Sequence, residues 1–311
     1  MNNFTSISDV ENPTKLVQQV LSIKNNSTEL NPGKDKSLAL IFFNPSLRTR
    51  MSTQKAAQNL GMDITVMNIG EDAWNIEFED GTVMDGSIQE HIKDAVQIIS
   101  GYCDILGVRT FANLQNREED YEEKVLSKFL EYSSVPVISL ESATLHPLQS
   151  LTDLVTIAET KIQKPKVVLS WAPHPRKLPQ AVANSFLEWM AQTDADITLA
   201  HPEEYELSEQ FTNGIPVTHN QRRAFEDADF IYAKNWSSYS NYGQTPVVTE
   251  DWTITQDKMD LTNHAKFMHC MPIRRNVVAT DEVIDQSLVY KQAKNREYAA
   301  QAVLQNILEN L

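Results

Sequence analysis

Short apolar runs alternate with longer amphipathic stretches along most of this sequence. The run 38–43 reads Leu-Ala-Leu-Ile-Phe-Phe, an amphipathic stretch follows over 51–60, and a second short run follows over 64–68. A short apolar run predicts a strand buried on both faces, and an amphipathic stretch predicts a helix. Strand, helix and strand at this rhythm are typical of parallel β-α-β units. The pattern therefore predicts an α/β fold of doubly wound parallel sheets.

The same rhythm occurs in both halves of the chain. Its 311 residues favour two domains, since a domain has about 100–200 residues. The stretch 148–160 predicts a long helix that joins the halves, and 241–250 is rich in turn-forming residues and predicts a loop. The other expected strands are 105–108, 136–140, 167–171, 196–200, 230–233 and 266–269, and the other expected helices are 91–101, 121–132, 181–193, 224–226 and 294–311.

Composition argues against several classes of protein. The chain has 27 Lys+Arg and 42 Asp+Glu, so its net charge is 27 − 42 = −15, which disfavours nucleic acid and anionic membranes as partners. No apolar run approaches the roughly 20 residues that span a bilayer, and the start does not resemble a signal peptide. Two cysteines, Cys103 and Cys270, form no metal or disulfide pattern, and the G-x-G-x-x-G, P-loop and H-E-x-x-H motifs are missing from the sequence. We expect a cytoplasmic protein.

The clearest constellation of polar residues follows the first predicted strand. Ser46, Arg48, Thr49 and Arg50 lie where that strand gives way to a helix. Strand carboxyl ends and helix N-termini bind anions, and arginine forks suit phosphate oxygens. On these residues alone, a plain N-cap with surface arginines stays open.

The segment Ser-x-Arg-Thr-Arg resembles the carbamoyl phosphate motif of the aspartate/ornithine carbamoyltransferase family. Further matches follow in the family's order over nearly the whole chain, and they include the His-Cys-x-Pro segment of the ornithine branch. These matches are Arg109, His146-Pro147-Leu148-Gln149, His269-Cys270-Met271-Pro272 and Asn295-Arg296.

The resemblance implies attack of an amine on the carbonyl carbon of carbamoyl phosphate, without a cofactor, a metal or a covalent enzyme intermediate. Holding the two reactants in the correct orientation can by itself lower the activation barrier of this reaction substantially. Arg109, His146 and Cys270 are the expected catalytic residues, although the thiol of Cys270 need only touch the substrate. By resemblance, carbamoyl phosphate would be bound by Ser46, Leu47, Arg48, Thr49, Arg50, Trp74, Arg109, His146, Gln149, Cys270, Met271 and Arg296.

Lys234 bears on which amine is the acceptor. Family members that use free ornithine have an Asp-x-x-x-Ser-Met-Gly segment whose aspartate pairs with the α-ammonium, whereas this chain has Lys234 and no Ser-Met-Gly. A lysine would repel an ammonium but suits a carboxylate on an acylated ornithine, as in the similar N-acylornithine carbamoyltransferases. That resemblance implies an acylornithine site made of Gln89, Phe111, Glu141, His174, Lys234 and Arg274.

Gln89 favours one acyl group. The aligned residue is typically Glu in acetyl-preferring members and Pro in succinyl-preferring members, and a neutral Gln would not repel a succinyl carboxylate. We therefore expect N-succinylornithine as the acceptor, with N-acetylornithine as the alternative, and a role in arginine biosynthesis.

The family also implies an assembly. Trp74 and the loop 84–91 are expected to reach a neighbouring active site in a homotrimer. The implied domains are 1–145 for carbamoyl phosphate, 146–291 for the acylornithine, and a helix at 292–311 that packs back on the first, with the active site in a cleft.

Each of these residues also has an ordinary structural alternative. Trp74 would be a core or interface residue, His146 a turn histidine, and Cys270 an inert buried thiol. Surface charges would account for Arg109, Lys234 and Arg296, and Glu141 would be a surface acid or an N-cap. Two other functions are alternatives for the whole chain. The His-Cys-Met-Pro segment argues against an aspartate carbamoyltransferase, and the intact arginines argue against a non-catalytic homologue.

Overall fold

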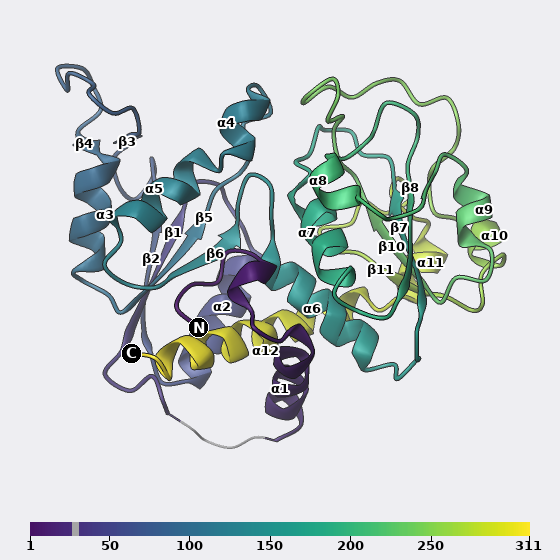
Figure 1. The fold of residues 1–311 in the computed structure, drawn as a ribbon, viewed down its shortest axis with the longest axis horizontal. Coiled ribbons are helices and arrows are strands. Elements are labelled where there is room, and N and C mark those ends of the chain that lie inside the picture. Colours follow the sequence, from purple (N-terminus) through teal and green to yellow (C-terminus); the bar gives the residue numbers. More distant parts are fainter. Residues whose placement is uncertain (27–30) are drawn as a thin grey trace. The chain divides into compact units, whose positions relative to one another are not determined.

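Every predicted apolar run forms a strand of a parallel sheet in the computed structural model, which describes residues 1–26 and 31–311 (Figure 1). The chain divides into two units. The first comprises residues 1–113, 118–148 and 296–311, and the second comprises 114–117 and 149–295. Besides the short excursion at 114–117, the chain passes between the units inside the helices α6 (Pro147–Ala158) and α12 (Val289–Leu308).

The first unit contains a parallel sheet in the strand order β2-β1-β5-β6. Alternate strand residues such as Ala39, Ile41 and Val108 join Val96 and Phe129 in one apolar core, so helices α3 and α5 cover that face. The elements before α6 are η1 (Ile7–Asp9), α1 (Pro13–Asn25), β1 (Ser37–Phe42), α2 (Arg48–Asn59), β2 (Asp63–Asn68), β3 (Ile76–Glu77), β4 (Glu90–His91), α3 (Ile92–Ser100), β5 (Ile105–Arg109), α4 (Arg117–Tyr121), α5 (Lys124–Tyr132) and β6 (Val137–Glu141).

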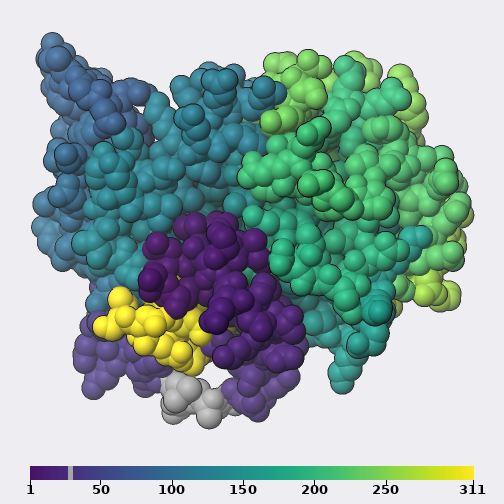
Figure 2. Space-filling view, viewed as in Figure 1, coloured from purple at the N-terminus to yellow at the C-terminus, as the bar shows by residue number. Residues whose placement is uncertain are grey.

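The two ends of the chain meet on the first unit. Figure 2 shows the N-terminal segment beside the end of α12. Asn306 and Gln19 exchange two side-chain hydrogen bonds of 2.9 and 3.1 Å, and Asn59 of α2 donates to Glu297 at 3.0 Å. These bonds join α12 to α1 and α2, and they place Arg296 in the unit that carries Ser46–Arg50.

The second unit contains a parallel sheet in the order β11-β10-β7-β8-β9. Strand β10 is buried at every position, and β7 is buried at every position after Lys166, as their apolar runs predict. The elements are β7 (Lys166–Trp171), α7 (Ala181–Met190), β8 (Asp196–Ala200), α8 (Glu209–Thr212), β9 (Val217–Thr218), α9 (Gln221–Phe225), β10 (Phe230–Lys234), α10 (Gln256–Met259), β11 (Lys266–Met268) and α11 (Asp281–Asp285).

Two predicted helices need correction, and one short strand pair was missed. The helix expected at 121–132 is broken, because Glu123 adopts a left-handed φ of 53° between α4 and α5. The last helix begins at Val289 instead of 294, since the polar Gln292 is buried on it. The short pair β3-β4 was not predicted.

Across residues 1–26 and 31–311, no helix combines the length and the hydropathy that crossing a membrane requires.

Candidate active site

The turn from β1 into α2 places the predicted phosphate-binding residues at a helix N-terminus. Leu47 directly precedes α2, and within the described parts of the chain no side chain caps the helix, so the plain N-cap alternative for Ser46 and Thr49 is wrong. Arg50 lies over the ring of Phe42, 5.6 Å from its centroid. The uncapped N–H groups and the nearby arginines suit an anion.

Arg109 is the last residue of β5 and is only 6 % exposed, so the surface-arginine alternative is wrong. One guanidinium nitrogen donates to the carbonyls of Asn44 (2.8 Å) and Pro45 (2.9 Å), and the other donates to Glu141 Oε2 at 3.0 Å. The ring of Phe111 lies 4.1 Å from the guanidinium carbon. Arg109 therefore ties the turn after β1 to the end of β6, and Glu141 is its buried partner.

His146 connects this ion pair to the start of α2. Its Nε2 lies 3.7 Å from Glu141 Oε2 and 3.4 Å from a nitrogen of Arg296, which also donates to Thr49 Oγ1 at 2.8 Å. His146 and Arg296 are 3 % and 6 % exposed, so a solvated Arg296 is excluded. The first unit thus brings Thr49, Arg109, Glu141, His146 and Arg296 into one polar network.

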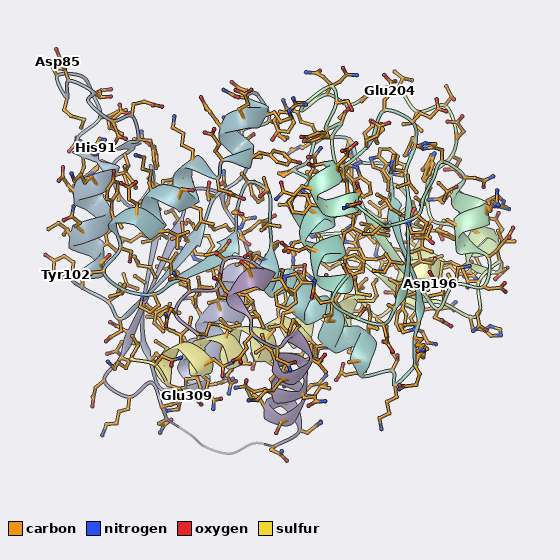
Figure 3. All side chains as sticks on the ribbon, viewed as in Figure 1. Asp85, His91, Tyr102, Asp196, Glu204 and Glu309 are labelled. Carbon is orange, nitrogen blue, oxygen red and sulfur yellow. The ribbon has the colours of Figure 1, made fainter. Side chains whose placement is uncertain are left out.

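Trp74 and Gln89 lie outside this network, near the segment between β3 and β4. Trp74 is 51 % exposed, so it is no core residue of this chain, and its Nε1 donates to Glu90 Oε2 at 2.7 Å. Gln89 is also exposed. Figure 3 labels Asp85 at the outer end of the segment and His91 at its base. Both predicted residues therefore face solvent in the single chain.

In the second unit, Lys234 ends β10 and is only 8 % exposed, so a solvated lysine is excluded. Its ammonium donates to the carbonyl of Asn235 at 3.0 Å. In the same unit, Arg274 Nε donates to His174 Nε2 at 3.1 Å. Burial, and the charges of Lys234 and Arg274, lower the pKa of His174.

Both ring nitrogens of His174 have polar partners. Nε2 accepts from Arg274 Nε, and Nδ1 lies 2.9 Å from the carbonyl oxygen of Arg176 and 3.1 Å from the backbone nitrogen of Arg176. The unit therefore presents two cations, Lys234 and Arg274, beside an imidazole whose pKa is lowered by burial and by their charges.

Asp153, a residue whose role the sequence did not reveal, connects Gln149 to the segment after β11 through Gln292. Asp153 Oδ1 accepts from Gln149 Nε2 (2.7 Å) and from Gln292 Nε2 (2.6 Å), and Gln292 Oε1 accepts from the N–H of His269. His269 Nδ1 in turn accepts from the N–H of Met271, whose φ is +56°. Asp153 is the only charged residue of α6 and lies four residues after Gln149, which was the one signal of its role. Cys270 is half-buried beside this turn.

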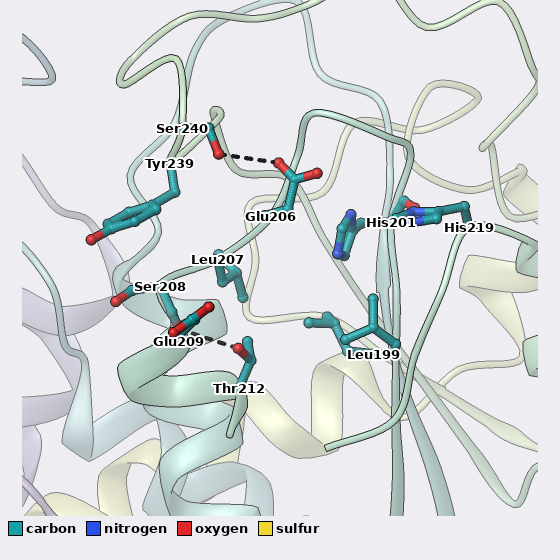
Figure 4. Close-up of a pocket in the computed structure, with 11 residues that line it drawn as sticks. Leu199, His201, Glu206, Leu207, Ser208, Glu209, Thr212, His219, Tyr239 and Ser240 are labelled. Carbon is teal, nitrogen blue, oxygen red and sulfur yellow. Dashed lines mark hydrogen bonds between the residues drawn. The ribbon is translucent and has the colours of Figure 1, made fainter. Parts of the chain in front are cut away.

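A separate cavity of about 500 Å³ in the second unit contains none of these residues (Figure 4). His201 and His219 line it, with Nδ1 atoms that face backbone carbonyls at 2.8 and 2.9 Å. Throughout the described residues, no three His, Cys, Asp or Glu side chains are grouped as metal ligands.

The fold and the polar network around Arg109 and Arg296 together match one class of enzyme. Residues 2–159 match the carbamoyl-P binding domain of aspartate/ornithine carbamoyltransferase, and residues 179–307 match its Asp/Orn binding domain. The chain belongs to the aspartate/ornithine carbamoyltransferase family, and it is therefore a transferase.

Within the family, the chain is 49 % identical to the N-succinylornithine carbamoyltransferase of Bacteroides thetaiotaomicron, over 100 % of both chains. It is 38 % identical to the N-acetylornithine carbamoyltransferase of Xanthomonas campestris, over 87 % of each. A solved acetylornithine transcarbamylase complexed with acetylcitrulline has a TM-score of 0.91 and 34 % identity, over 99 % of each chain. A variant of N-acetyl-L-ornithine transcarbamylase complexed with carbamyl phosphate and N-succinyl-L-norvaline also has a TM-score of 0.91, with 34 % identity over 99 % of this chain and 100 % of that one.

Proposed function

We propose that this protein transfers the carbamoyl group of carbamoyl phosphate to the side-chain amine of N-succinyl-L-ornithine. The amine forms a C–N bond to the carbonyl carbon, the C–O bond to phosphate breaks, and the amine loses a proton. The products are N-succinyl-L-citrulline and phosphate. The observation that carries the proposal is the full-length 49 % identity to an N-succinylornithine enzyme.

The first unit supplies the groups for carbamoyl phosphate. Ser46, Leu47, Arg48, Thr49 and Arg50 would hold the phosphate at the uncapped start of α2. Arg109, His146 and Arg296 would donate to the carbonyl oxygen as negative charge develops on it, and such preorganised donors are the largest catalytic term in many enzymes. Trp74, Gln149, Cys270 and Met271 would complete the site, the last three by contact with the carbamoyl group.

The acceptor is expected to be recognised by charge. Lys234 and Arg274 would bind its carboxylates, with His174, Phe111 and Glu141 around them. A free α-ammonium would be repelled by Lys234, whereas an acylated nitrogen is neutral. Gln89 carries no charge that would repel the second carboxylate of a succinyl group, which favours N-succinylornithine over N-acetylornithine.

Side-by-side carbamoylation tests the choice of acceptor. The purified protein is expected to turn over N-succinylornithine with a kcat/KM at least about tenfold above that for N-acetylornithine, a difference of about 1.4 kcal/mol that one additional carboxylate contact can supply. Phosphate release is the measurement, and free ornithine is the control. Faster turnover of the acetyl compound would reject the succinyl proposal, and no phosphate release with any acceptor would favour the non-catalytic homologue.

We also propose that the protein is a cytoplasmic homotrimer in arginine biosynthesis, with Trp74 and Gln89 serving the site of a neighbouring subunit. Their exposure supports this assignment, because a solvent-facing Trp commonly belongs to an interface.

A subunit-mixing experiment tests the shared site. Trp74→Ala and Arg48→Ala should each be strongly impaired alone. After exchange of subunits, random mixing should restore about a quarter of the sites, because a site in a cyclic oligomer then combines an intact Arg48 with a neighbour's intact Trp74. Activity of the mixture that stays at the mean of the two variants, after exchange is verified by mass spectrometry, would contradict the proposal.

A further inference from the structure

The loop between Glu141 and His146 is held by a residue to which neither the sequence nor the proposed function assigned a role. Among the described residues, all the side-chain hydrogen bonds that the carboxylate of Glu123 accepts come from this loop. Oε1 accepts from Ser142 Oγ (2.6 Å), from the N–H of Thr144 (2.8 Å) and from Thr144 Oγ1 (2.5 Å), and Oε2 accepts from the N–H of Ala143 (3.1 Å).

We propose that Glu123 is a positioning residue for the carbamoyl transfer: by anchoring residues 142–144 it fixes Glu141 and His146 relative to each other. This inference rests on the proposed function. Glu141 and His146 are the two ends of the anchored loop, and they approach to 3.7 Å through Oε2 and Nε2. Glu141 also holds Arg109, so a shift of the loop would move both groups that are expected to face the carbonyl oxygen.

The backbone of Glu123 supports this role. A non-glycine residue with a φ of 53° is uncommon, and such conformations persist where the surrounding structure enforces them. Here the left-handed residue interrupts the amphipathic pattern that predicted one helix over 121–132. The interruption coincides with the side chain that binds the loop.

The chemistry requires a carboxylate and not merely a polar side chain. The N–H groups of Ala143 and Thr144 donate to different oxygens of Glu123, so both oxygens must accept. A glutamine has one acceptor oxygen, and its NH₂ group would face an N–H of the loop. Burial raises the pKa of Glu123, and the hydrogen bonds from Ser142, Thr144 and Ala143 oppose that shift.

The substitution Glu123→Gln tests the proposal, with Glu122→Gln as its matched control. Glu122 is the adjacent residue, it is exposed, and its carboxylate has no hydrogen-bond partner among residues 1–26 and 31–311. Glu123→Gln should lower kcat about tenfold, less than the 10²-fold that a 1 Å misplacement can cost, while Glu122→Gln stays within about twofold of the unaltered protein.

A double-mutant cycle with His146→Ala separates positioning from general stability. Because part of the effect of Glu123 passes through His146, Glu123→Gln should lower kcat by clearly less than tenfold once His146 is removed. A tenfold loss in both backgrounds would overturn the proposal. If circular dichroism shows that Glu123→Gln does not fold, Thr144→Val enters the same cycle, since it removes one of the four donors and keeps the side-chain shape.

The cycle also distinguishes the two proposals. An unaltered protein that releases no phosphate with any acceptor would overturn the proposed function itself. An active protein in which Glu123→Gln and His146→Ala multiply would overturn only the role of Glu123.

Discussion

Replacing Arg109 with alanine is expected to lower the free energy of unfolding by about 3–5 kcal/mol, because it leaves the carboxylate of Glu141 buried without its cationic partner. The Arg109 and Glu141 side chains are only 7 % and 11 % exposed. The substitution also removes the donor to the carbonyls of Asn44 and Pro45. We expect kcat to fall at least about 100-fold as well, the typical cost of losing one donor to a developing oxyanion. Chemical denaturation and phosphate release measure the two effects.

Two further variants separate stability from catalysis. Arg109→Ala/Glu141→Ala should regain much of the lost stability, since neither member of the ion pair is left buried without the other, but it should not regain activity. Arg222→Ala is the matched surface control, because Arg222 makes a comparable 2.7 Å pair with Asp257 in solvent. If Arg109→Ala destabilised the protein no more than Arg222→Ala does, the buried ion pair would not have the structural weight that we give it.

The strands were predictable because their signal is local. A run such as 38–43 is apolar at every position, which only a strand buried on both faces requires. The position of Arg48, Thr49 and Arg50 was predictable for the same reason, since a polar segment that follows such a run must lie at the carboxyl end of the strand. Resemblance to a family added roles for residues that the periodicity alone left ambiguous.

The errors arise where distant residues determine local structure. Glu123 breaks a continuous helical pattern because its partners lie 19 to 21 residues further along the chain. Asp153 and Gln292 are 139 residues apart, and each alone would be expected on a solvated face. Buried polar groups need partners, but a sequence does not say which ones.

Lys234 is expected to determine how well the acceptor binds. Lys234→Met should lower kcat/KM for N-succinylornithine by about 10–150-fold, which corresponds to the loss of about 1.5–3 kcal/mol from one hydrogen bond to a charged group. Lys234 is buried, and its ammonium has only the carbonyl of Asn235 as a hydrogen-bond partner among the described residues. A buried cation with a single neutral partner favours an anionic ligand. The KM for carbamoyl phosphate should change less than about twofold, since uniform binding of the other substrate is retained.

Lys266→Met is the control for this substitution, because Lys266 is an exposed lysine of β11 in the same unit. It removes the same charge from the chain and should leave both substrates unaffected within error. Initial rates over a matrix of the two substrate concentrations give both KM values for each variant. Equal losses for N-succinylornithine and carbamoyl phosphate in Lys234→Met would mean that Lys234 supports the second unit generally, and an unchanged kcat/KM would remove it from the acceptor site. The selective loss is expected because, in the proposed reaction, only the acceptor brings carboxylates that a buried ammonium can bind.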